Sequence, residues 1–511
     1  MATELLSEKY AVDLLGILNC YDRVIITGNL QPLCYAKGMT KYLYEQGVRI
    51  FGYTGFASPL RDEVRANAEA IAKQNNLEIE FIGKSKLFRK EDRIQGILQV
   101  RGTQPGLVHV FSAMERCTAY LPWHDKKNGK TYVKSTSGKC LHYYFYFMDE
   151  ELGLCYLRVP TWCPFRLQFY FNGHNWLANQ LKQHGIEFEQ HDNAFLSIAD
   201  FEIANQLSAQ LDIEKLHAKL DYFAQQYCPV VNTLNLQYSW SLMQAEYATD
   251  LIFKSQQTLQ AFFPFLLEAL IQAVKPADIA TFLGRKLNGN YQGELGNCFN
   301  KRWLGRRIKH HMGPVSIKMY DKYNIILRIE TTVNEVSFFK QYRQVQHRDG
   351  SPTTTWAPMK KTIYSLPALQ ECLLAANQRY LKFISAIATP EVGVEKLHRL
   401  AETKVENNRR YKGFNLFSEE DSCLIRALLS GEFCLSGFTN RNLRQLFPQK
   451  NSGQITRLLN RLHVHGLIKK VSKRYKYYLS DFGRQVIAMA LKLRAMVIIP
   501  ELAFSSPPTQ A

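Results

Sequence analysis

Apolar and polar positions in the first hundred residues follow two different periods. Between two strand-like runs, Val64, Ala68 and Ile71 fall on one face at helical spacing. Strand and helix patterns in alternation predict an α/β unit of the βαβ type over residues 1–105. The strand-like runs are Arg23–Thr27, Val48–Tyr53 and Glu78–Ile82.

From about residue 106 the pattern changes to aromatic and β-branched runs separated by acidic or proline-containing turns. Such runs are typical of neighbouring antiparallel strands. They predict a β meander with a following helix over residues 106–197, packed on the first unit. The runs are Leu141–Met148, Gly153–Val159 and Phe165–Phe171.

Residues 198–405 are predicted to be mainly helical. Leucines recur near the helical period between Ile198 and Leu283. A second β-rich patch, Val315–Thr332, interrupts this region as a hairpin that turns at Tyr323 and Asn324. No internal repeat is visible. The polar residues 406–417 are the best linker candidate.

The last region, residues 418–500, predicts three helices, a two-stranded hairpin and a final helix. Ser418 and Thr439 are typical helix N-caps. In the third predicted helix, apolar residues recur at the spacing of a buried face, and a basic hairpin tip follows at Lys473 and Arg474. This order is that of a winged helix-turn-helix domain, and residues 501–511 are predicted to be a disordered tail.

Three segments of this region resemble winged-helix regulators of the MarR type: Ile455–Leu459, His465–Lys470 and Tyr478–Arg484. The resemblance implies a third helix that enters the DNA major groove and a wing that contacts phosphates. The candidate DNA-binding residues are Gln454, Arg457, Asn460, Arg461, Lys473 and Arg474.

Charge supports a polyanionic partner. The chain has 64 Lys and Arg against 45 Asp and Glu, a formal net charge of +19. Residues 418–500 hold fourteen of these cations and five of these acids, so nearly half of the excess lies in one small region. This concentration favours nucleic acid, with double-stranded DNA first, over a general role in solubility. A homodimer is compatible with such a domain.

A second basic strip lies near the middle of the chain, where Lys301–His311 contains five Lys or Arg, two histidines and no acid. An aromatic residue among fixed cations suits contact with phosphates and bases, although a solvated surface is the simpler alternative. The candidate nucleic-acid-binding residues are Arg302, Trp303, Arg306, Arg307 and Lys309.

Just beyond this strip, Tyr320-Asp321-Lys322 and Arg328-Ile329-Glu330 stand on either side of the predicted turn. The pair weakly resembles strands of phage and plasmid replication initiators. Together with Asn172-Gly173-His174, these segments are also similar to segments of bacterial proteins. That similarity does not indicate a particular reaction. The resemblance raises the alternative of an enzyme that acts on nucleic acid.

Four carboxylates are predicted at or near strand ends, where magnesium ligands are common. We expect Mg²⁺ only if they converge, and a catalytic His174 is a minor alternative. The weak catalytic candidates are Asp22, Asp149, Asp321 and Glu330.

The eleven cysteines are scattered and form no CxxC pair, so no disulfide framework, metal site or cofactor site is predicted. No segment is apolar enough to predict a membrane span. The sequence thus predicts a cytoplasmic, multidomain α+β or α/β protein. It binds nucleic acid through a C-terminal winged helix, in transcription regulation or in a mobile genetic element. The alternative is a metal-dependent nuclease or a replication-initiator-like enzyme.

Overall fold

A computed structural model describes residues 5–83, 88–287, 291–302, 305–388, 391–428, 433, 437–471, 476–499 and 502. The side chains of residues 272, 299–302, 305, 306, 388, 391–394, 492, 496 and 497 lie outside this description. The chain divides into two compact units, Met1–Ala388 and Thr389–Ala511.

The first unit is built on one eleven-stranded sheet in the order β10-β11-β12-β13-β9-β1-β6-β5-β4-β3-β2. All neighbours are antiparallel except β2 and β3. The strands are β1 (Leu14–Leu30), β2 (Ile79–Phe81), β3 (Gly106–Asp125), β4 (Lys130–Asp149), β5 (Gly153–Pro160), β6 (Leu167–Asn172), β9 (Tyr238–Phe253), β10 (Leu295–Arg302), β11 (Gly305–Met312), β12 (Val315–Lys322) and β13 (Ile326–Val333).

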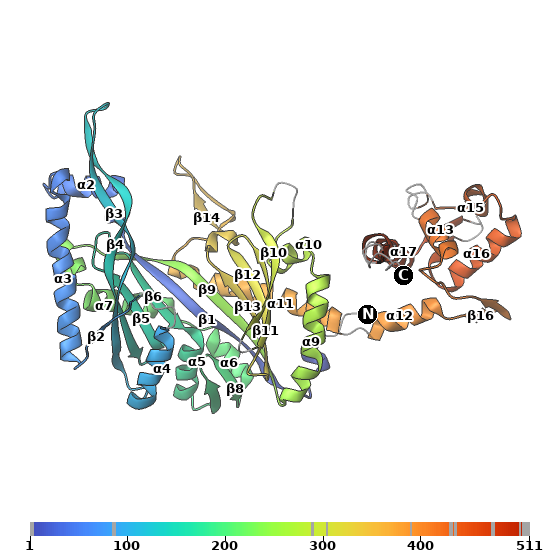
Figure 1. Ribbon diagram of the computed structural model, residues 1–511, viewed down its shortest axis with the longest axis horizontal. Helices are drawn as coiled ribbons and strands as arrows, with labels where there is room; N and C mark the ends of the chain where they lie inside the picture. Colours follow the sequence, from blue (N-terminus) through green and yellow to red (C-terminus); the bar gives the residue numbers. More distant parts are fainter. Residues whose placement is uncertain are drawn as a thin grey trace, which may run out of the picture. The chain divides into compact units, whose positions relative to one another are not determined.

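The sheet has a repeated topology (Figure 1). In each half a long strand, β1 or β9, is followed by helices and then by a four-stranded antiparallel meander. The last meander strand returns to pair with the long strand. The two long strands pair with each other at the centre. The sequence shows no repeat because only the topology is duplicated.

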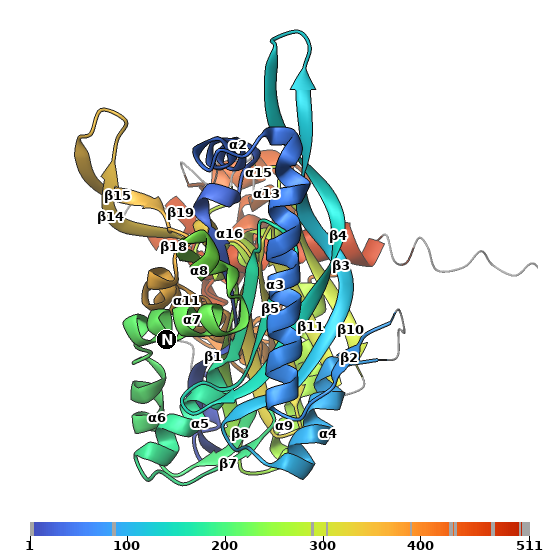
Figure 2. The same cartoon turned by 90° about the vertical axis from the view of Figure 1, so that its left-hand side faces the viewer.

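Helices cover one face of this sheet. On α7, Phe223 and Tyr227 pack against Phe169 and Phe147, while α11 packs on β9 and β13. Figure 2 shows the long helix α3 running along the strands. The helices of this unit are α1 (Leu6–Lys9), α2 (Ala36–Glu45), α3 (Tyr53–Gln74), α4 (Lys90–Arg101), α5 (Gly173–Gln183), α6 (Phe201–Ser208), α7 (Ile213–Tyr227), α8 (Val230–Leu234), α9 (Gln256–Ala273), α10 (Pro276–Phe282) and α11 (Leu366–Ala388), with 3-10 turns Gln31–Leu33, Ile50–Gly52, Val336–Phe338 and Ile363–Ser365.

The opposite face is covered only in part. At its β3–β4 edge, Ile94 of α4 packs against Phe111, Tyr144 and Tyr146. A small hairpin of β7 (Phe188–His191) and β8 (Ala194–Ile198) reaches the middle of the sheet. Two ribbons project beyond the sheet, the β3–β4 ends and the pair β14 (Lys340–Gln346) and β15 (Pro352–Pro358) (Figures 1 and 2).

Several sequence predictions need correction. The meander and the hairpin between residues 315 and 332 are confirmed, but both belong to one sheet with β1, so no boundary falls near residues 105 or 197. The first strand pairs with β6 and β9 rather than in a βαβ unit. The predicted strand Val48–Tyr53 is a 3-10 turn that leads into α3. The central strand β9 lies in the region that was predicted to be helical.

The second unit has its own core, in which Leu400 and Phe414 pack with apolar residues of the later helices. Phe438 forms an isolated bridge with Tyr477. The predicted linker contains a short hairpin instead of an irregular chain. The elements are α12 (Glu391–Ala401), β16 (Lys404–Glu406), β17 (Arg409–Tyr411), α13 (Glu419–Leu428), α15 (Asn440–Leu446), α16 (Ser452–Val464), β18 (Ile468–Val471), β19 (Lys476–Leu479), α17 (Asp481–Leu493) and a π-helical turn Arg494–Ile498. Among the described residues of both units, no helix combines the length and the apolar character needed to span a bilayer.

Candidate active site

Strand register places a set of charged residues on the partly covered face of the sheet. Lys318 on β12 lies opposite Glu330 on β13, and Arg328 lies opposite Asp250 on β9. Because side chains alternate between faces along a strand, residues two apart share a face. Glu246 and Asp250 lie an even number of positions apart along β9, so the Glu246 side chain faces the same side of the sheet.

The third carboxylate comes from β1. The pairing of β1 with β9 shifts register between Tyr21 and Val24, which marks a bulge beside Glu246. Asp22 lies in this bulge. One oxygen from each of Asp22, Glu246 and Glu330 lies within 4.8 Å of the other two. We call these three residues the acidic centre.

Arg328 ties the acidic centre to the sheet. Its guanidinium has no exposed surface and donates two hydrogen bonds to Asp250, at 2.7 and 2.6 Å. A further contact of 3.4 Å reaches Asp22, and the backbone oxygen of Asn193 accepts from it at 2.8 Å. Charge-assisted bonds of this kind are strong and directional. Arg328 thus holds β9, β1 and the β7–β8 hairpin in one arrangement.

The Asn172-Gly173-His174 segment orients Asp22. Asn172 caps α5 by accepting from the His174 backbone N–H, and its amide donates to Asp22 Oδ1 at 2.9 Å. Asn193 donates to the same oxygen at 2.7 Å. The buried His174 ring lies 3.5 Å from this oxygen and 3.3 Å from Arg328. Asp22 Oδ1 thus accepts from two amides, and Asp22 Oδ2 has one long contact with Arg328.

Glu330 and Glu246 are held from the β12 side. The Lys318 ammonium contacts the Glu330 carboxylate and lies 3.4 Å from Glu246. The Tyr320 hydroxyl donates to Glu330 at 2.7 Å, and the Thr332 hydroxyl donates to Glu246 at 3.2 Å. Glu246 keeps 15% of its side chain exposed, so the acidic centre opens to solvent on its side.

Ionisation differs across the acidic centre. Burial and the negative charge of Glu330 raise the pKa of Glu246. Burial opposes ionisation of Asp22 and Glu330, but the His174 ring and Arg328 lower the pKa of Asp22, and Lys318 lowers that of Glu330. Repulsion among three close carboxylates is relieved by a cation. Buried carboxylate oxygens are the donors that Mg²⁺ and Mn²⁺ prefer.

The structure brings together two of the four carboxylates proposed from the sequence, Asp22 and Glu330. Asp149 instead pairs with Lys219 of α7 at 2.9 Å. Asp321 lies between Tyr320 and Lys322, so strand alternation puts its side chain on the other face of β12.

Glu246 was missed because its segment was predicted to be helical. A signal was present: Glu246, Ala248 and Asp250 alternate with Tyr247 and Thr249 at the spacing of a strand. This alternation separates a polar face from an aromatic one.

Of the central basic strip, Lys301 and Arg302 end β10, and residues 305–311 lie in β11. Arg307 lies opposite Tyr320, and Lys309 lies opposite Lys318, so both share the face of the acidic centre. Of the other candidates, Trp303 lies outside the described residues, and so do the side chains of Arg302 and Arg306.

In the second unit, Gln454 and Arg457 are exposed on α16 and Asn460 is half-buried. In this conformation the Arg461 side chain is not free to contact DNA. It forms a bidentate pair with Asp421, donates to two backbone carbonyls and keeps 13% of its side chain exposed. Lys473 and Arg474 lie outside the described residues.

In comparisons with known proteins, no family model, no curated sequence and no solved structure matches this chain.

Proposed function

We propose that this protein binds DNA and cleaves a phosphodiester bond in it at a divalent-metal centre held by Asp22, Glu246 and Glu330. The observation that carries the proposal is the meeting of three carboxylates, from β1, β9 and β13, in a strongly basic chain. Convergence of carboxylates is the feature that separates an enzyme on nucleic acid from a protein that only binds it.

A metal ion at this place would polarise the phosphodiester and lower the pKa of a bound water. The chain's own residues prepare the site. Arg328 and Asn172 keep Asp22 oriented, and the Tyr320 hydroxyl orients Glu330. The Lys318 ammonium beside the acidic centre offers positive charge to the phosphate during cleavage.

The position of Tyr320 favours a second candidate reaction, strand transfer of the replication-initiator kind. The Tyr320 oxygen attacks the scissile phosphorus and forms a phosphotyrosine bond. The bond from phosphorus to the leaving strand breaks, and the leaving oxygen takes up the proton that the hydroxyl loses. The hydroxyl already lies within the acidic centre, hydrogen-bonded to Glu330.

The second unit supports DNA binding as a winged helix. From α13 onward its described elements run α13, α15, α16, the β18–β19 hairpin and α17, and Phe438 forms an isolated bridge with Tyr477 beside the hairpin. Gln454 and Arg457 on α16 are the exposed residues that we propose contact bases. Arg461 is left out of this set because Asp421 holds it.

The test is cleavage of labelled single-stranded and supercoiled DNA. We expect cleavage with Mg²⁺ or Mn²⁺ and none with EDTA. D22N, E246Q and E330Q should each slow cleavage by at least about a hundredfold. E69Q, which changes an exposed carboxylate on α3, is the matched control and should cleave at the wild-type rate.

Binding of Mn²⁺ measured by calorimetry gives a readout that needs no substrate, and E246Q should weaken it while E69Q does not. Y320F separates the two reactions. Hydrolysis survives the change, whereas strand transfer is lost together with a denaturant-stable protein–DNA adduct. Cleavage that persists in EDTA, or wild-type Mn²⁺ affinity in E246Q, would contradict the metal centre.

A further inference from the structure

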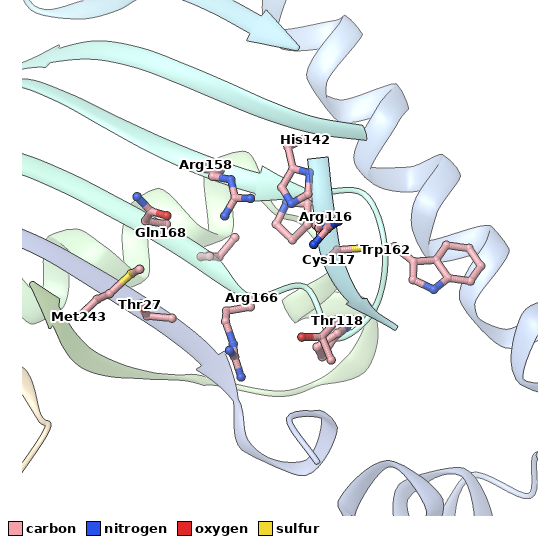
Figure 3. Close-up of a pocket in the computed structure, with 13 residues that line it drawn as sticks. Thr27, Arg116, Cys117, Thr118, His142, Arg158, Trp162, Arg166, Gln168 and Met243 are labelled. Atoms are coloured by element: carbon pink, nitrogen blue, oxygen red, sulfur yellow. The ribbon is translucent and has the colours of Figure 1, made fainter. Parts of the chain in front are cut away.

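A pocket of about 350 Å³ opens between β3, β5 and β6 of the first unit (Figure 3). Three arginines line it: Arg116 from β3, Arg158 from β5 and Arg166 from the loop before β6. Thr27, Thr118 and Gln168 add hydrogen-bonding groups. The acidic centre does not use any of these side chains.

The pocket carries net positive charge. Glu115 pairs with Arg158 at 2.6 Å, which neutralises one arginine. Arg116 and Arg166 are exposed, and no carboxylate among the described residues pairs with either. Burial and Arg158 lower the pKa of His142 to about 4, so this ring is neutral at physiological pH. The buried Nε of Arg158 has no hydrogen-bond partner in the described part of the chain. A buried donor without a partner is unfavourable, so an acceptor that a ligand supplies would stabilise it.

Strand register connects the pocket to the acidic centre. Gln168 in the pocket lies opposite both Thr27 of β1 and Arg158 of β5. Asn172, which donates to Asp22, is four residues further along β6 on the same face. At strand spacing the two places are about 13 Å apart, a gap that a short stretch of nucleic-acid strand spans.

The surface between the two places suits unpaired bases. Tyr170 faces the same side, halfway between Gln168 and Asn172, and stacks on Tyr156 with ring centroids 5.0 Å apart. The exposed Arg23 lies over the Tyr170 ring at 5.8 Å. Partly exposed aromatic rings on a sheet, flanked by arginines, are a common platform for bases of a single strand.

We propose that the arginine pocket, formed by Arg116, Arg158 and Arg166, binds a backbone phosphate of a single-stranded DNA substrate. The bases of that strand lie over Tyr170 toward the acidic centre. The inference rests on the proposed function and deepens it by naming an unpaired strand as the substrate. It assigns to the first unit a nucleic-acid contact separate from the strip on β11 and from the second unit.

The test uses the full chain in EDTA, where no cleavage occurs. Fluorescence anisotropy measures binding of a labelled oligothymidylate in the presence of excess unlabelled duplex, which occupies the second unit. R116A/R166A should weaken this binding at least about tenfold and reduce the slope of log affinity against log salt by about 0.7, because one phosphate is no longer neutralised. R158A is not used, because it would leave the Glu115 carboxylate without its arginine partner.

K73A/K182A is the matched control, because it removes two exposed cations on α3 and α5. It should bind the oligonucleotide as the wild type does. Equal affinity of R116A/R166A and wild type would overturn the inference, and so would equal weakening in the control pair. Competition by inorganic phosphate without any strand binding would also overturn it.

The E246Q variant separates the test of the arginine pocket from the test of the metal centre. The inference predicts that R116A/R166A lowers the affinity of E246Q for the oligonucleotide as much as it lowers that of the wild type, whether or not cleavage depends on Glu246. Absence of metal-dependent cleavage in the wild type, with arginine-dependent binding intact, would defeat the proposed function alone.

Discussion

Arg328 has no exposed surface although its side chain carries a full positive charge. Burial of an ion is costly unless partners compensate it, and Asp250 and Asp22 supply that compensation. The same contacts place Asp22 in the acidic centre. The Arg328 side chain is therefore needed both for folding and for the proposed chemistry.

Removing the charge of Asp250 should reveal this dependence. D250N leaves Arg328 with a weakened partner set and should lower the free energy of unfolding at neutral pH by about 3–5 kcal/mol. Urea unfolding followed by circular dichroism measures the difference. D62N, at an exposed position on α3, is the control and should change stability by less than about 0.5 kcal/mol.

The pH dependence of the free energy of unfolding follows from the direction in which the pKa of Asp250 is shifted. Burial opposes ionisation of Asp250, but Arg328 lowers its pKa to about 2, below the value of about 3.9 in an unfolded chain. The contribution of ionised Asp250 to the free energy of unfolding is therefore complete above about pH 4 and is lost as the pH falls toward 2. The gap between wild type and D250N should narrow over that range. A gap that is constant with pH would contradict this account.

At the scale of elements, the acidic centre depends on how β6 passes into α5. Gly173 stands where a Cβ atom would lie 2.2 Å from the Tyr21 backbone oxygen, so any side chain pushes α5 away from β1. The neighbours of Gly173 are Asn172 and His174, both of which lie against Asp22. The strand-to-helix junction thus sets the position of one carboxylate of the acidic centre.

G173A should therefore affect both stability and the acidic centre. We expect a loss of about 1–3 kcal/mol in the free energy of unfolding from overpacking, and weaker Mn²⁺ binding in calorimetry. G96A, in α4 with open space around it, is the control and should be neutral or stabilising by up to about 1 kcal/mol. Unchanged Mn²⁺ affinity in G173A would show that the junction does not position Asp22.

At the scale of the whole molecule, the two units have separate cores. The core of the second unit includes Leu400 of α12 and Phe414, which both precede the helices predicted from the sequence. The His465 ring donates from Nδ1 to the Arg399 backbone carbonyl at 3.3 Å. This unit therefore begins before residue 406, where the sequence predicted a linker.

A fragment of residues 389–511 should fold alone, unfold cooperatively in urea and be more stable than a fragment of residues 414–511, which lacks Leu400. It should bind duplex DNA with a steep salt dependence, and R457A should weaken that binding. K450A, which removes a cation paired with Glu420, is the control. No shift of any duplex at low salt would contradict the winged-helix proposal.

Local patterns determined much of this protein. The meander strands, the β12–β13 hairpin and the helices of the second unit follow from periodicity, caps and turn residues, which act over a few positions. Positive φ angles at Tyr323 and Asn324 occur at the predicted turn. Asp22 and Glu330 were proposed as carboxylates near strand ends, but both lie inside strands, Asp22 in β1 and Glu330 in β13.

Only the tertiary structure decided what those elements form together. β9 has nearly continuous burial along its second half, since it lies between β1 and β13, although Glu246 and Asp250 are part of its sequence there. Without β9 neither Glu246 nor Asp250 can be placed. Strand pairing between residues hundreds of positions apart carries no local signature. The acidic centre and the arginine pocket are products of register across the sheet, which the sequence alone leaves open.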